Sequence, residues 1–283
     1  MTRPERAVVL AAGLGTRMRR ADPAASLEAG QTAAADAGLK ALVPVPRPFL
    51  DYVLSGLADA GIRDVCIVVG PGPSPLRDRY GALETSRLRI GFAVQREPRG
   101  TADAALAAEE FAAGEDFLLL NSDNYYPLAA YRALRELNGP GLPVFDRESL
   151  VARGNITRER VRRFAVLRVD DAGFLTRIDE KPGAASLCED DSPEAGPSPG
   201  AGRGRLLVSM NLWRFSPAVF DACRRVPVSA RGELELPQAV QYGIDRLGMR
   251  LRAFPCTEGV LDLSSRADVA SVADALRGVE ARL

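Results

Sequence analysis

Apolar segments of strand length alternate with helical segments over the first half of the chain. Residues 6–11 (RAVVLA), 65–69 (VCIVV) and 117–120 (FLLL) are continuous apolar runs, a pattern typical of strands buried on both faces. Helical spacing of apolar residues predicts helices at 48–60 and 101–112 between these runs. Because parallel strands are joined by such crossover helices, we predict an α/β fold with a mainly parallel sheet and helices on both faces.

The second half of the chain follows a different pattern. After a strand at 88–94 and a helix at 128–137, apolar segments at 164–169 and 174–178 flank the turn sequence DDAG at 170–173, which predicts an antiparallel hairpin. The other predicted elements are a strand at 206–215, a helix from Pro217, a helix at 236–247, a strand at 250–254 and a final helix at 266–283. The sheet is therefore expected to be mixed.

Two segments interrupt the regular pattern of what we predict to be a single domain, residues 1–283. Residues 182–205 are rich in Pro, Gly and Ser and hold few large apolar side chains, which predicts a flexible loop. Residues 20–38 are rich in alanine and follow a glycine-containing loop directly. They are interpreted as a surface helix with flexible ends, with a lid over a bound ligand as the alternative.

Composition excludes several classes of function. The chain has no histidine, so it cannot hold a Ser-His-Asp triad, a histidine-ligated metal or a histidine proton shuttle. Its 37 basic and 37 acidic residues balance, and no basic block is combined with aromatic residues, so we expect no nucleic-acid partner. Four scattered cysteines without a CxxC pair, and the lack of a long apolar run, favour a cytoplasmic protein without a membrane partner.

A glycine-containing loop, AGLGTRM, follows the first predicted strand, at the edge of an open α/β sheet where ligands usually bind. It is not a Walker A loop, because no Gly-Lys-Ser/Thr follows. It is not the dinucleotide fingerprint either, because Met18 stands where the third glycine should be. The remaining interpretation is a loop whose N–H groups approach phosphate oxygens, with Arg17 able to make bidentate contacts to them.

The lysines are the second unusual feature. Only two of the 37 basic residues, Lys40 and Lys181, are lysine, and the rest are arginine. A compact ammonium suits a point contact with a phosphate oxygen better than a planar guanidinium does. The two lysines are therefore candidates for phosphate contacts.

The loop and its surroundings resemble a known family. LAAGLGTRM at 10–18, with Lys40 in LKALVPV, resembles the signature of the sugar-1-phosphate nucleotidylyltransferases, or NDP-sugar pyrophosphorylases. Further motifs of that family follow in its order: Gln95 with RGTA at 99–102, LNSDN at 120–124, EKP at 180–182, FSP at 215–217, ELP at 235–237 and VLD at 260–262. The resemblance implies a Rossmann-like fold, with residues 1–140 mainly binding nucleotide and residues 141–283 mainly binding sugar phosphate.

The resemblance also implies an enzyme of the nucleotidyltransferase class. A nucleoside triphosphate and a sugar 1-phosphate would give an NDP-sugar and pyrophosphate. The attacking phosphate oxygen is already ionised near neutral pH, so catalysis reduces to positioning two anions and neutralising their charge. Arginine, lysine and Mg²⁺ supply that charge, which agrees with the lack of histidine.

Roles for individual residues are carried over from the family's motifs. Arg17, Lys40 and Lys181 are the predicted catalytic residues, and Asp123 and Asp262 are predicted to share Mg²⁺. Asn124, Glu180 and Asn211 are predicted to contact the sugar phosphate. The predicted nucleotide site consists of Leu10, Ala11, Gly13, Gly15, Thr16, Gln95, Gly100 and Thr101, with Gln95 and the Gly100 backbone as the pair that reads the base.

Several alternatives stay open. The base is not fixed, since segments like RGTAD occur in relatives that use different nucleotides. Asn211 stands where many relatives carry a glycine that lines the sugar site, which puts the usual hexose pose in doubt. The other functions considered are a catalytically silent, nucleotide-sugar-binding regulatory subunit and nucleotidyl transfer to choline phosphate or a cyclitol phosphate, with Tyr125, Tyr126 and Trp213 as candidate cage residues. We expect no left-handed β-helix after the last motif, and a homo-oligomer remains open.

Overall fold

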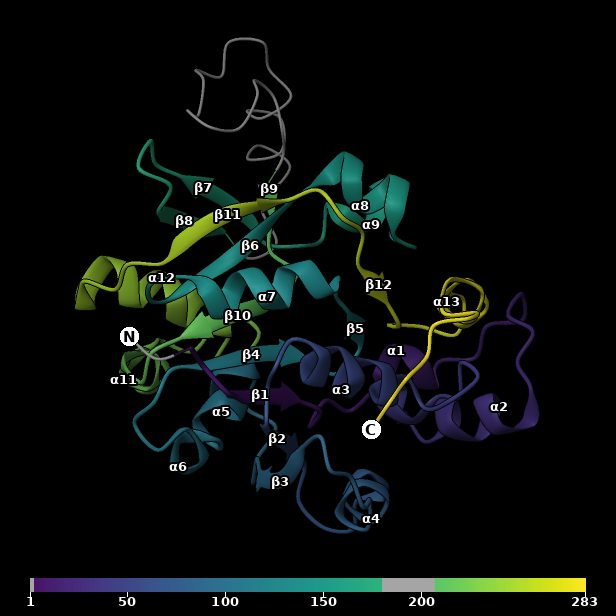
Figure 1. The fold of residues 1–283 in the computed structure, drawn as a ribbon. Coiled ribbons are helices and arrows are strands. Elements are labelled where there is room, and N and C mark those ends of the chain that lie inside the picture. The colour runs from purple at the N-terminus through teal and green to yellow at the C-terminus, as the bar shows by residue number, and fades with distance from the viewer. Residues whose placement is uncertain (1–2, 180–206) are drawn as a thin grey trace.

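The fold is a mixed sheet covered by helices on both faces, as seen in a computed structural model that describes residues 3–179 and 207–283 (Figure 1). One half of the sheet is parallel, in the order β3-β2-β1-β4. These strands are β1 (Arg6–Leu10), β2 (Asp64–Val69), β3 (Arg89–Val94) and β4 (Phe117–Asn121). All four were predicted from the sequence, and the predicted α/β class is confirmed.

The other half of the sheet is mixed and begins where β10 (Leu212–Phe215) pairs antiparallel with β4. Next to β10 lies β6 (Gly141–Asp146), which also pairs in parallel with β11 (Arg252–Cys256). The sheet continues through β9 (Leu207–Val208) to the hairpin of β7 (Val166–Val169) and β8 (Leu175–Asp179). The predicted hairpin is therefore confirmed. The parallel half of the sheet and the mixed half are joined by the pairing of β4 with β10.

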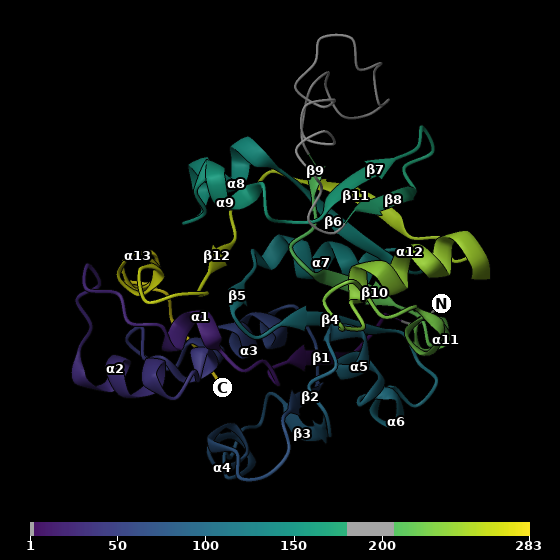
Figure 2. The same cartoon turned by 180° about the vertical axis from the view of Figure 1, so that it is seen from behind.

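Two apolar layers hold the helices onto the sheet. Alternation along β1 directs Val9 into the layer under α3 (Phe49–Asp59) and α7 (Leu128–Glu136), and Val8 into the opposite layer. Figure 2 shows that opposite face, covered by α5 (Thr101–Leu106), α11 (Ala218–Arg225) and α12 (Leu236–Leu247). The other helices are α1 (Thr16–Arg19), α2 (Ala29–Asp36), η1 (Lys40–Leu42), α4 (Pro75–Gly81), α6 (Glu109–Ala112), α8 (Arg147–Arg153), α9 (Arg158–Val161) and α13 (Asp268–Ala275). Among residues 3–179 and 207–283, no helix is long and apolar enough to cross a bilayer.

Three predicted elements were wrong in extent. The helix at 101–112 is broken into α5 and α6 by Ala107 and Ala108. The strand at 206–215 is interrupted between β9 and β10, where Asn211 has a φ of 55°. The final helix ends at Ala275 and not at Leu283, because the chain turns at Gly278 with a φ of 83°.

The segment from 138 to 163 received no assignment from the sequence, yet it contains β6, α8 and α9. All six residues of β6 are buried, but its sequence GLPVFD holds a glycine and a proline that depress strand propensity. The predicted flexible loop at 182–205 lies outside the described residues. The insertion at 20–38 contains the predicted helix as α2 (Figure 1). Its last residue, Asp36, pairs with Arg266.

Arg214 on β10 connects the two halves of the sheet and is 1% exposed. Its guanidinium pairs with Asp116, just before β4, at 2.8 Å and also donates to the carbonyl of Leu137 at the end of α7. We expect Arg214→Met to lower the free energy of unfolding by about 2 kcal/mol, since the Asp116 carboxylate, 27% exposed, loses its partner and the Leu137 carbonyl loses its donor. Urea denaturation measures this change.

The matched control for Arg214 is Arg224→Met. Arg224 is also in an ion pair, with Glu109, but both side chains are more than 40% exposed. Its substitution is expected to change the free energy of unfolding by less than about 0.5 kcal/mol. Equal effects of the two substitutions would contradict the role assigned to Arg214.

Candidate active site

A cavity of about 430 Å³ opens at the carboxyl ends of β1 and β4. Its walls come from the loop after β1, the start of η1, the loop before α5 and the turn after β4. Ten of the residues predicted for the site line it: Leu10, Ala11, Gly13, Gly15, Thr16, Lys40, Gln95, Gly100, Thr101 and Asp123. These ten predicted residues span 113 positions of the sequence, from Leu10 to Asp123, and meet in one cavity.

The glycine loop forms one wall and leaves its N–H groups available. Within the part of the chain that the structure describes, the N–H groups of Gly13, Leu14 and Gly15 donate to no protein acceptor. Gly15 has a φ of 62°, and a Cβ there would lie 2.1 Å from the Gly38 carbonyl oxygen. The position therefore requires glycine, and the end of the 20–38 insertion packs directly against the loop. Arg17 lies exposed on α1 and does not line the cavity.

The opposite wall is the loop from Gln95 to Thr101. Gly100 has a φ of 117°, and a Cβ there would lie 2.5 Å from the Leu234 carbonyl oxygen. The Leu234 N–H donates to the Arg99 carbonyl, and the Leu236 N–H donates to the Thr101 hydroxyl at 2.9 Å. Leu236 of the ELP motif and the preceding Leu234 thus support this loop. Glu233, two residues before the motif, also lines the cavity, which the sequence did not predict.

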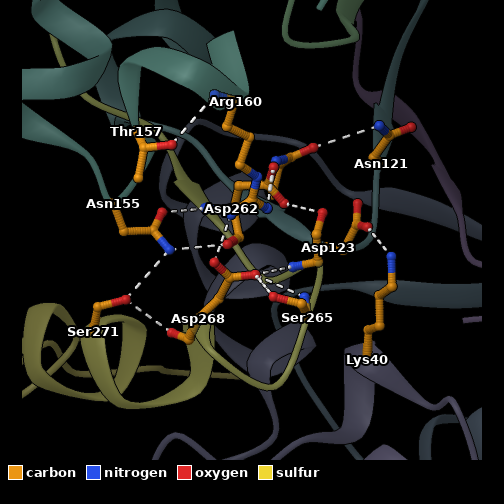
Figure 3. A network of polar contacts seen from close by, with 12 residues as sticks. Lys40, Asn121, Asp123, Asn155, Thr157, Arg160, Asp262, Ser265, Asp268 and Ser271 are labelled. Carbon is orange, nitrogen blue, oxygen red and sulfur yellow. Dashed lines mark hydrogen bonds and ion pairs between the residues drawn. The ribbon is translucent and has the colours of Figure 1, made fainter. Parts of the chain in front are cut away.

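Lys40 and Asp123 form an ion pair in the cavity wall. The Lys40 Nζ lies 2.8 Å from Asp123 Oδ2, and the two side chains are 16% and 20% exposed. Asp123 lies in the turn after β4, and Lys40 begins η1 behind the glycine loop. The pair places a positive and a negative charge side by side where both can reach a ligand in the cavity (Figure 3).

Asp262 approaches Asp123 through a small second sheet. β5 (Asn124–Tyr125) pairs antiparallel with β12 (Leu261–Asp262), and Asp262 lies opposite Asn124. The Asp262 carboxylate accepts a hydrogen bond from the Ser264 hydroxyl at 2.6 Å and pairs with Arg160 at 2.8 Å. Asp262 does not line the cavity, and its side chain is 6% exposed. Figure 3 shows its polar contacts.

Arg160 contacts the predicted metal ligand Asp262, although no sequence pattern predicted this contact. It lies on α9, in the segment without an assignment, and its guanidinium bridges Asp262 and Asp268. From the same segment, the side chain of Asn155 donates to the Asp262 carbonyl and accepts from the Asp262 N–H. A four-residue helix without a motif gave no signal for these contacts.

The two carboxylates are suited to a hard divalent cation. Burial raises the pKa of the Asp262 carboxyl above its ordinary value, and repulsion by the negative charge of Asp123 raises it further. A cation between them would relieve that repulsion. Asp123 Oδ1 has no protein donor among the described residues, and each carboxylate oxygen has two lone pairs, so acceptor capacity remains despite Lys40, Ser264 and Arg160. The residues therefore fit Mg²⁺.

The other predicted residues do not line the cavity or fall outside the described residues. Asn124 is 4% exposed and accepts from Tyr126 and Asn121 at 3.4 Å. Asn211 has a φ of 55°, and its side-chain oxygen is buried without a donor among the described residues. Glu180 and Lys181 fall outside residues 3–179 and 207–283.

Comparisons with known proteins point to nucleotidyltransferases, as the sequence motifs do. A family model described as nucleotidyl transferase matches residues 35–255. A glucose-1-phosphate thymidylyltransferase of Streptomyces griseus is 31% identical over 242 residues, which cover 85% of this chain and 57% of that protein. A UTP–glucose-1-phosphate uridylyltransferase of Haloferax volcanii is 29% identical over 235 residues, 83% of this chain and 81% of that protein.

A solved structure of a UDP-glucose pyrophosphorylase complexed with UDP-glucose superposes with a TM-score of 0.71 at 16% identity. The alignment covers 98% of this chain and 100% of that chain, so the fold is shared along the whole length. This chain spans 57–58% of the length of three of the curated relatives that it matches.

Proposed function

We infer, because this chain belongs to the nucleotidyl transferase family, that it joins a nucleoside triphosphate to a sugar 1-phosphate and releases pyrophosphate. The observation that carries this proposal is the Lys40–Asp123 pair after the end of β4, in one cavity with a loop whose three N–H groups, of Gly13 to Gly15, donate to no acceptor among the described residues. Such a cavity binds a phosphate chain on one side and offers one cationic and one anionic group to its reacting end.

The reaction needs charge placement more than proton transfer. An oxygen of the sugar phosphate attacks the α-phosphorus of the triphosphate and forms the new P–O bond. The bond from the α-phosphorus to the bridging oxygen breaks, and its electron pair leaves with pyrophosphate. No proton has to be removed from the nucleophile, which agrees with a chain that has no histidine.

Each step has residues that supply it. The N–H groups of Gly13 to Gly15 bind the departing phosphates, and Lys40 donates to an oxygen of the reacting phosphate. Arg17 would contact phosphate oxygens and Lys181 would contact the sugar phosphate; both roles rest on the motif match alone. Asp123 and Asp262 would hold Mg²⁺, which when bound neutralises phosphate charge and polarises the reacting phosphorus.

The names of the relatives support a pyrimidine nucleotide and glucose 1-phosphate as the first substrates to test. The relatives at 31% and 29% identity are named as thymidylyl- and uridylyltransferases of glucose 1-phosphate. Transfer to choline phosphate has less support, because Trp213 is 0% exposed and stacks on Phe215 in the core, 5.4 Å between ring centroids, so it cannot cage a cation in the cavity.

The test is release of pyrophosphate from UTP, dTTP, CTP, GTP and ATP against a panel of sugar 1-phosphates, with and without Mg²⁺. We expect turnover with a uracil or thymine nucleotide and glucose 1-phosphate, dependent on the metal. Tight binding of an NDP-sugar without turnover of any pair would instead favour the regulatory subunit. Turnover that is unchanged by chelation would contradict the role of the two aspartates.

A further inference from the structure

The side-chain amide of Gln95 is held in one orientation. Its Nε2 donates to the Gly100 carbonyl at 2.9 Å and to Asp103 Oδ2 at 3.0 Å. Gln95 is 5% exposed and lines the cavity. Both partners accept hydrogen bonds and cannot donate them, so the amide nitrogen must face them. The amide oxygen, Oε1, is then the atom left for a ligand.

Asp103 is itself fixed from the outside. It lies in the first turn of α5, is 8% exposed, and pairs through Oδ1 with the Arg99 guanidinium at 2.6 Å. Its other oxygen, Oδ2, accepts from Gln95. A chain of contacts therefore runs from the exposed Arg99 through Asp103 to Gln95, and only Gln95 of these three residues lines the cavity.

We propose that Asp103 is a positioning residue for base selection, which fixes Gln95 as a hydrogen-bond acceptor. This inference rests on the proposed function, in which the base is uracil or thymine. Both bases carry a donor, N3–H, between two carbonyl oxygens, so N3–H matches Gln95 Oε1. In cytosine, which has the same ring size, N3 is an acceptor and would face another acceptor. Asp103 thus makes the enzyme reject CTP without touching the nucleotide.

The Gly100 N–H completes the match. It donates to no acceptor among the described residues, and Gly100 lines the cavity next to Gln95. It can therefore donate to a carbonyl oxygen of the base while Gln95 accepts from N3–H. A flipped Gln95 amide would present a donor to the ring nitrogen and favour cytosine, but it would place its oxygen against the carboxylate of Asp103, which prevents the flip.

The decisive variant is Asp103→Asn, which keeps the shape of the side chain and adds a donor. The amide introduced by this substitution can donate to a flipped Gln95, so one of the two contacts that oppose the flip is removed and only the Gly100 carbonyl still opposes it. We expect the ratio of kcat/KM for UTP over CTP to fall by at least about fivefold, the lower end of what a two-point base contact contributes. KM for the sugar 1-phosphate should not change, because the contact lies at the base.

Two further variants keep the test interpretable. Arg99→Gln removes the outer contact of Asp103 at an exposed side chain, and we expect a smaller fall of the same ratio. Glu97→Gln is the matched control, because Glu97 is 71% exposed and its side chain contacts Arg99 alone among the described residues, at 3.7 Å. Its ratio should equal that of the wild type. Circular dichroism and thermal melting confirm that each variant is folded.

The outcomes separate this inference from the proposed function. If the wild-type chain binds no nucleoside triphosphate in calorimetry and releases no pyrophosphate, the proposed function fails, and the inference fails with it. If the wild type uses UTP or dTTP but Asp103→Asn keeps the wild-type ratio, only the inference is overturned. A wild-type chain that uses CTP as well as UTP overturns it too. A ratio that falls in Asp103→Asn and Arg99→Gln, but not in Glu97→Gln, supports it.

Discussion

Replacing Lys40 by alanine is expected to lower kcat by about a hundredfold or more, as losing a single preorganised donor to a reacting group commonly does. Lys40 Nζ is 2.8 Å from Asp123 and lines the cavity, so its charge lies at the proposed reacting phosphate. Its side chain is only 16% exposed, and water cannot fully replace the ammonium there. Initial rates of pyrophosphate release at saturating substrates measure the loss.

Two variants show whether the loss comes from the charge at this position. Lys40→Arg keeps the charge but spreads it over a plane, so we expect an intermediate kcat. Arg89→Ala is the matched control: Arg89 also pairs with an aspartate, Asp64, at 2.6 Å, but it is 76% exposed and does not line the cavity. The assignment of Lys40 is wrong if Lys40→Ala turns over as fast as Arg89→Ala.

The sequence predicts the parallel half of the fold well, because its strands are continuous apolar runs and the ends of parallel strands share one edge. Asp123 lies just after β4 at that edge, so its position follows from this rule. Lys40 follows the inserted segment, and its contact with Asp123, 83 residues away, was expected only from the family motif. The glycine loop is identifiable for the same reason as Asp123. Its contact with Gly38 is not, because it depends on how the inserted segment folds back.

The parts that the sequence does not predict depend on long-range packing. β6 is buried at all six positions, but Gly141 and Pro143 lower its strand propensity, so the sequence did not predict a strand there. Pairing with β10 and β11 stabilises the strand despite that low propensity. Arg160 reaches Asp262 from a short helix with no motif, across 102 residues. No local pattern records such a contact.

Asn211 shows where a departure from a family pattern has a structural basis. The resemblance to the family implies a glycine at this position, and the backbone there has a φ of 55°. This left-handed region favours glycine, and asparagine is among the few other residues that adopt it readily. The backbone conformation that a glycine would provide is thus retained, while an amide is added whose oxygen has no donor among the described residues.

Replacing Asp123 by asparagine is expected to have the largest effect, a fall in kcat of about a thousandfold, because metal assistance contributes several kcal/mol to such reactions. Asp123 lines the cavity and keeps one carboxylate oxygen without a protein donor among the described residues, whereas Asp262 is more enclosed and is held by Arg160 and Ser264. Asparagine preserves the shape but removes the charge that attracts the cation. Pyrophosphate release gives kcat, and binding of Mn²⁺ followed by electron paramagnetic resonance gives the metal affinity directly.

Comparison with Asp262→Asn tests the order of importance of the two carboxylates. Because Asp262 does not line the cavity, we expect its substitution to weaken Mn²⁺ binding less than Asp123→Asn does. Asp64→Asn, in the ion pair with Arg89 away from the cavity, should leave both kcat and Mn²⁺ binding unchanged. Wild-type Mn²⁺ affinity in Asp123→Asn would exclude Asp123 as a ligand. A larger loss of Mn²⁺ affinity in Asp262→Asn would mean that the cation lies closer to Asp262 and that the Arg160 guanidinium moves away from Asp262 when the cation binds.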